Sequence, residues 1–145
     1  APPMDNDRPA DGLLGQKTFD TAREWPYDAQ GPRALRFPYA LDTDGHRLVV
    51  ADTANNRVLI WNHFAPTDRF SAADAVLGQN DFDANGENRW DAVADDTLCW
   101  PYGLCLHRDR LAIADSGNNR VIVWSLADLS APATAPDTAA ASSAL

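Results

Sequence analysis

Apolar residues in this chain form short, uninterrupted runs separated by polar, turn-forming residues. The runs within Arg47–Ala51 and Val58–Trp61 are rich in β-branched residues, and so are those within Arg110–Ala114 and Val121–Trp124. A strand with one face in water alternates apolar and polar residues, so continuous runs indicate strands covered on both faces. Because the runs are short and punctuated by Gly, Asp and Asn, they favour strands over helices. The pattern therefore predicts an all-β fold.

The same pattern occurs twice at one spacing. "RLVVADTANNRVLIW" begins at Arg47, and "RLAIADSGNNRVIVW" begins at Arg110. The pairs "LLGQKTFD" and "VLGQNDFD", and "RFPYAL" and "CWPYGL", keep the same offset without a gap, beginning at Leu13 and Val76 and at Arg36 and Cys99. A constant offset over three blocks indicates a repeat architecture, in which each repeat is one supersecondary unit. The offset is 63 residues, as from Arg47 to Arg110, and two positions separated by it are called counterparts.

Each repeat is predicted to supply three consecutive strands, flanked by outer strands at the "LGQ" segments. A Pro precedes the first strand of each repeat, a position that Pro suits in a sheet. We expect eight strands: Gly12–Gln16, Tyr39–Asp42, Arg47–Ala51, Val58–Trp61, Ala75–Gln79, Tyr102–Leu106, Arg110–Ala114 and Val121–Trp124.

The turn between the last two strands of each repeat reads "ADxxNNRV". In a four-residue hairpin loop, the Asp lies opposite the Arg across the base of the turn. Such a cross-strand charge pair contributes about 0.2–1 kcal/mol, and Asn suits the left-handed backbone positions of these loops. We therefore predict a structural corner formed in the two repeats by Asp52, Asn56, Arg57, Asp115, Asn119 and Arg120.

The two segments "FPYALDTDGHRLVVADTANNRVLIWN" and "WPYGLCLHRDRLAIADSGNNRVIVWS" resemble NHL repeats, and "LGQxxFD" resembles the outer-strand segment of a bacterial subgroup of that family. The resemblance covers most of residues 13–126. It implies that each repeat is one four-stranded blade of a β-propeller, with blades stacked around a central channel, often six to a ring. Family members include peptide-amidating lyases, RNA-binding domains and many binding scaffolds, so the resemblance does not by itself select a function.

On this interpretation the chain has three parts. Residues 1–12 are an N-terminal extension, residues 13–126 are two blades, and residues 127–145, rich in Ala, Pro, Ser and Thr, are a disordered or linker tail. Two blades cannot close a propeller ring, which needs four to eight. We expect the ring to be completed by self-association, with three chains favoured, by a partner protein that supplies blades, or by the remainder of a longer propeller. In a head-to-tail ring, Gly12–Gln16 would complete the second blade of a neighbouring copy.

Charge narrows the choice of partners. The net charge of −9 and the isoelectric point near 4.5 oppose binding to nucleic acid, because a phosphate backbone needs a basic surface. They also oppose binding to anionic membrane surfaces, and no apolar run approaches the length of a membrane span. We expect neither nucleic acid nor membrane as a partner.

The first strand of each blade would line the channel. The residues placed there are Tyr39, Asp42, Tyr102, Cys105 and His107. They allow an alternative in which the chain is a lyase or hydrolase whose site forms only in the assembled ring. Zinc-dependent lyase relatives would need several channel histidines, and these strands contain only His107. Cys105 and His107 point to the same side of a strand and can bind zinc or copper, with Cys99 near in sequence, but no further ligand is evident. A buried structural thiol is the other interpretation of these cysteines.

One loop has part of a calcium-site pattern. "DFDANG" places Asp81, Asp83 and Asn85 before a Gly, like the first half of a calcium-binding loop, but its twelfth position is Ala92 rather than a carboxylate. The alternatives are a calcium-stabilised structural module and a turn capped by Asx side chains. No other cofactor is expected.

The connectors on either side of the outer strands hold aromatic residues that either pin the loops or bind a ligand: Phe19, Trp25, Tyr27, Phe82 and Trp90. The preferred function is a module for protein–protein binding and scaffolding within a larger ring.

Overall fold

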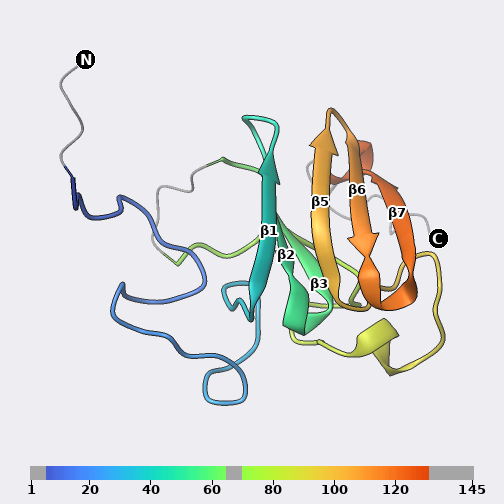
Figure 1. The fold of residues 1–145 in the computed structure, drawn as a ribbon, viewed down its shortest axis with the longest axis horizontal. Helices are drawn as coiled ribbons and strands as arrows, with labels where there is room; N and C mark the ends of the chain where they lie inside the picture. The colour runs from blue at the N-terminus through green and yellow to red at the C-terminus, as the bar shows by residue number, and fades with distance from the viewer. Residues whose placement is uncertain (1–5, 65–69, 131–145) are drawn as a thin grey trace, which may run out of the picture.

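The computed structural model describes residues 6–64 and 70–130, which form two antiparallel β-sheets (Figure 1). The first sheet has four strands in chain order: β1 (Pro38–Thr43), β2 (Leu48–Asp52), β3 (Arg57–Trp61) and β4 (Ala75–Leu77). The second has three: β5 (Pro101–His107), β6 (Arg110–Asp115) and β7 (Arg120–Ser125). The helices of the described residues are short 3₁₀ turns: η1 (Thr53–Asn55), η2 (Glu87–Trp90), η3 (Ser116–Asn118) and η4 (Ala127–Ser130). The all-β prediction is confirmed.

The two repeats fold alike in detail. Asp52 pairs with Arg57 at the end of the β2–β3 ladder, and Asp115 pairs with Arg120 at the same place between β6 and β7. The first strand pair of each sheet also has an irregular register at its start, just after Pro38 and Pro101. Within the three-strand units, equal sequence at counterpart positions therefore produces the same strand pairing.

The core lies between the two sheets. Val49, Val58 and Ile60 of the first sheet pack with Leu111 and Ile113 of the second in one buried cluster. Burying a side chain of this size stabilises a fold by roughly 1.5–3 kcal/mol. Figure 1 shows β1 and β5 as neighbours. Because the buried cluster contains side chains of both sheets, the sheets pack on each other as two layers.

The other face of the first sheet is covered by the N-terminal segment. Leu48, Val50 and Leu59 are buried there, with Leu14 and Leu35 packed against them. All residues of β2 and β3 are consequently buried, so the continuous apolar runs of the first repeat are covered on both faces. The prediction is wrong for the second repeat, where partly buried and exposed residues alternate along β7.

Strand formation by Gly12–Gln16 was a wrong prediction for this chain. The segment is irregular and pairs with none of the described strands. Its apolar Leu14 is used for packing, but an outer strand also needs a neighbouring strand edge for its backbone hydrogen bonds. The other outer segment, Ala75–Gln79, does find such an edge, and β4 forms along β3 over Ala75–Leu77.

The C-terminal end of the described residues packs on the core. Leu126 is buried, and Leu129 in η4 contacts the same cluster as the two sheets. The rest of the predicted tail, residues 131–145, and the first part of the predicted extension, residues 1–5, lie outside the described residues. None of the helices within 6–64 and 70–130 has the length and apolar character required to cross a bilayer.

Candidate functional site

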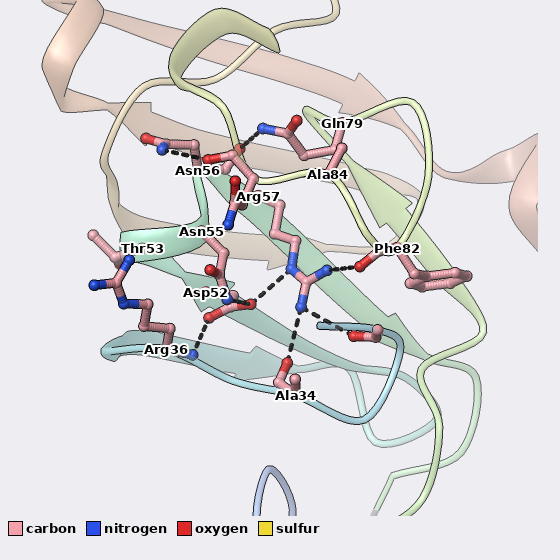
Figure 2. Close-up of polar contacts among 12 residues, drawn as sticks. Ala34, Arg36, Asp52, Thr53, Asn55, Asn56, Arg57, Gln79, Phe82 and Ala84 are labelled. Carbon is pink, nitrogen blue, oxygen red and sulfur yellow. Dashed lines mark hydrogen bonds and ion pairs between the residues drawn. The ribbon is translucent and has the colours of Figure 1, made fainter. Parts of the chain in front are cut away.

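The first corner is a buried ion pair with several further hydrogen bonds (Figure 2). Asp52 and Arg57 are both fully buried, and Arg57 Nε lies 2.7 Å from Asp52 Oδ2. The same oxygen accepts from the Asn55 amide at 2.8 Å, while Oδ1 accepts the Arg36 N–H at 2.6 Å. Burial raises the pKa of Asp52, and the charge of Arg57 and these hydrogen bonds oppose that rise.

Arg57 also holds two loops that are distant in sequence. Its Nη2 donates to the carbonyls of Gly31 and Ala34, at 3.1 and 2.9 Å, and its Nη1 donates to the Phe82 carbonyl. Figure 2 shows the guanidinium between these loops and the Asp52 carboxylate. The corner therefore fixes the connector before the first repeat and the connector after it.

The second corner repeats this arrangement at the counterpart positions. Asp115 accepts from Arg120 Nε at 2.8 Å and from the Cys99 N–H at 2.8 Å. Arg120 donates to the carbonyls of Ala94 and Thr97, the counterparts of Gly31 and Ala34. The side chain of Arg120 is 28% exposed, whereas that of Arg57 is fully buried. The second corner is thus formed but incompletely covered.

Asn56 connects the first corner to the following repeat. Its Oδ1 accepts the Trp100 N–H at 2.8 Å, and its Nδ2 donates to the Asn85 carbonyl at 3.0 Å. Its main-chain carbonyl accepts from the Gln79 side-chain amide at 2.9 Å. Asn56 is only 4% exposed, so these hydrogen bonds are shielded from water.

Two more hydrogen bonds link the first sheet to the second. Thr53 Oγ1 donates to the Pro101 carbonyl at 2.6 Å. The Leu106 N–H donates to Asp42 Oδ2, also at 2.6 Å. Asp42, placed by the sequence in a channel, therefore bridges the two sheets.

An arginine completes these contacts at the opposite end of the strands. Arg47 Nη2 donates to the Arg108 carbonyl at 2.7 Å and lies 3.2 Å from the Asp109 carboxylate. Burial alone would raise the pKa of Asp44, but hydrogen bonds from the N–H groups of Arg47 and His46, and the Arg47 guanidinium, lower that pKa to about 2. We call the contacts of Asp42, Arg47, Thr53 and Asn56 with the second repeat the inter-sheet seam.

On the side of the second sheet that faces away from the first, the counterparts of the seam residues contact no further sheet among the described residues. The counterparts of the four seam residues are Cys105, Arg110, Ser116 and Asn119. Within the described residues, none of their side chains is hydrogen-bonded to another sheet, and Asn119 is exposed. Val121 and Val123, the counterparts of the fully buried Val58 and the almost fully buried Ile60, are 70% and 55% exposed.

In the first sheet, the exposed apolar side chains lie on β1. Tyr39 and Leu41 are exposed, whereas their counterparts Tyr102 and Leu104 pack toward the first sheet. Tyr102 meets Tyr39 edge to face, with ring centroids 4.7 Å apart. The structure thus brings together three of the predicted channel residues, Tyr39, Tyr102 and Asp42, along the β1–β5 junction.

The Cys and His residues predicted as metal ligands do not form a group that could hold a metal ion. Cys105 and His107 are exposed at the end of β5, while Cys99 is buried, and burial together with the negative charges of Glu87 and Asp115 raises the pKa of its thiol. Throughout residues 6–64 and 70–130, no group of three His, Cys, Asp or Glu side chains is placed to hold a metal ion.

The residues of the predicted calcium loop serve the turn itself. Asp81 Oδ1 accepts the N–H groups of Asp83 and Ala84, at 2.9 and 2.8 Å. The Asn85 carbonyl accepts from Asn56. These are the contacts of a turn capped by an Asx side chain.

The connector aromatics divide into two groups. Phe82 packs against the first sheet, whereas Phe19, Trp25, Tyr27 and Trp90 are exposed. A cavity of about 400 Å³ lies within the N-terminal connector, and Arg23, Trp25 and Gln30 are among the residues that line it.

Sequence reasoning missed the inter-sheet role of Asn56, Thr53 and Gln79. One signal was available, because Gln79 and Gln16 occupy the same position of the "LGQ" block.

No protein-family model matches this sequence, and no curated protein matches it.

Proposed function

We propose that the chain is a β-propeller module of NHL type that acts in protein–protein binding and scaffolding, and that the open face of its second sheet and the exposed residues of β1 bind neighbouring blades. One observation carries the proposal. The face of the first sheet that contains Val58 and Ile60 is buried by the second sheet, while the matching face of the second sheet exposes Val121 and Val123. Apolar patches of this kind typically mark interaction sites.

The best partner for this face is the exposed side of β1 in the first sheet of another copy. Within the chain, the face of Val58 and Ile60 contacts a sheet that presents Leu104. The counterpart of Leu104 is Leu41, which is 68% exposed on β1. A second copy can therefore repeat, between chains, the contact that the two sheets make within one chain.

Such contacts are head-to-tail and close when the rotation per chain divides a full turn. Three copies of two blades each would give six blades, within the range of known propellers. A different protein that supplies blades is the other source of a neighbour.

The test is a charge placed on the open face. Replacing Val121 and Val123 by Lys should raise the dissociation constant of the assembly at least ten-fold, since it buries two charges without partners. Lys reduces the net negative charge, so general repulsion cannot cause the loss. Sedimentation velocity measures the assembly, and Val93→Lys, at an exposed connector position, is the matched control. Undiminished assembly of the double variant would contradict the proposal.

A further inference from the structure

Asn56 sits in a defined socket of the second repeat. The socket offers the Gln79 amide, the Asn85 carbonyl and the Trp100 N–H, which together engage the main chain and the side chain of Asn56. Beside it, the Pro101 carbonyl accepts from Thr53. Three of these four groups belong to the backbone, so their presence depends on local conformation more than on residue type.

The N-terminal part of the chain has the same groups at the counterpart positions. The counterpart positions are Gln16, Ala22, Phe37 and Pro38, which retain the side-chain amide, the carbonyl, the N–H and the second carbonyl. Gln16 donates to the Arg23 carbonyl at 2.7 Å, just as Gln79 donates to the Gly86 carbonyl at 2.8 Å. The glutamine is therefore held by its own loop in both copies.

One residue of this N-terminal socket, Phe37, has the backbone conformation of its counterpart in the occupied socket. Phe37 has φ 54°, close to φ 49° at Trp100, and both are non-Gly residues in the left-handed region. This conformation costs free energy for such residues. At Trp100 it aims the N–H at Asn56. At Phe37 no side chain of the described residues accepts the N–H, and the neighbouring Pro38 is exposed whereas Pro101 is buried.

The residues that would occupy this socket lie at the second corner. Asn119 has φ 54° and Asn56 has φ 52°, and Ser116 replaces Thr53 with the same hydroxyl. We infer that Asn119 of one copy docks into the Gln16–Ala22–Phe37 socket of a second copy, with Ser116 beside it on the Pro38 carbonyl. This inference rests on the proposed self-association and specifies the polar contacts that fix its register.

The contact between copies differs from the intrachain seam at two carboxylates. Asp109, which lies 3.2 Å from Arg47 within the chain, has His46 as its counterpart, so Arg110 finds no carboxylate there. Asp42, which accepts the Leu106 N–H within the chain, is replaced by Cys105 on the second sheet. A thiol is a weak acceptor, so the interface between copies loses a charge-assisted hydrogen bond. The interface between chains is consequently the weaker of the two, and the Asn119 contacts carry more of its specificity.

Substitution of Asn119 by Gly is the direct test. Gly accepts the positive φ without strain and removes the amide, so the fold of the single chain is preserved. Asn119→Asp is the second variant, because a carboxylate cannot donate to the Ala22 carbonyl. Loss of two hydrogen bonds at each interface should raise the dissociation constant of the full chain about ten-fold or more in sedimentation equilibrium. The melting temperature of dilute, dissociated protein should not change.

Asn56→Gly is the matched control, since it removes the same amide at the same φ. It should lower the melting temperature of the dilute chain, because its partners are in the same chain. If the wild-type chain assembles and the Asn119→Gly and Asn119→Asp variants assemble equally well, this inference alone is overturned. A wild-type chain that stays monomeric would overturn both this inference and the proposed self-association.

Discussion

Arg57 and Arg120 occupy the same place in the repeat but differ in their surroundings. Both pair with an aspartate and donate to two carbonyls of the preceding connector. Only Arg57 has a further acceptor among the described residues, the Phe82 carbonyl, on a connector that follows its repeat. A comparison of Arg57 with Arg120 therefore contrasts a complete corner with an incomplete one in the same molecule.

Replacing Arg57 by Ala should lower the free energy of unfolding by about 3–5 kcal/mol, because it leaves the buried Asp52 charge unpaired. The same change at Arg120, which is partly exposed, should cost about 1–2 kcal/mol. Urea denaturation of the two variants, followed by tryptophan fluorescence, measures both losses. Equal losses, or a larger loss at Arg120, would show that burial does not set the strength of the corner.

Sequence could predict the charge pair of each corner but not its other partners. The spacing of Asp52 and Arg57 around a four-residue turn indicates that they meet. The carbonyls of Gly31 and Ala34 leave no such signal, because every residue carries a carbonyl and only the folded path of the connector brings these two to the guanidinium.

At the scale of elements, the "LGQ" segment shows how one sequence block acts in two settings. Gly78 and Gly15 have φ of 89° and 83°, and each passes close over a leucine, Leu98 and Leu35 respectively. The segment before Gly78 forms β4 beside β3, whereas the segment before Gly15 has no strand beside it in the described residues. A repeated sequence therefore predicts the turn reliably, but a strand forms only where an edge is available.

Replacing Gly78 by Ala should lower the free energy of unfolding by roughly 1–3 kcal/mol. The alanine would have to adopt a positive φ, and its methyl group would clash with the neighbouring leucine. A Cβ at this position would lie 2.7 Å from Leu98 Cδ1, and Leu98 is fully buried and cannot move away easily. Gly15→Ala should cost less, because Leu35 is only partly buried. Thermal unfolding monitored by circular dichroism ranks the two variants. The reverse order would refute the role given to Leu98.

For the whole molecule, the sequence predicted the repeat, the strand order and the all-β class, because each depends on patterns local to one repeat. It did not reveal the inter-sheet seam. Asn56 and Thr53 act on residues of the next repeat, and their role depends on how two sheets stack, which no pattern within one repeat records. The stacked pair in turn provides the template for the proposed contact between copies.

The central claim is that the contact between the two sheets of one chain recurs between chains. Native mass spectrometry tests it most directly. The account predicts a closed assembly of three chains, with three times the 15.8 kDa mass of one chain, that dissociates to single chains on dilution. A chain that remains at 15.8 kDa at every concentration would contradict the claim.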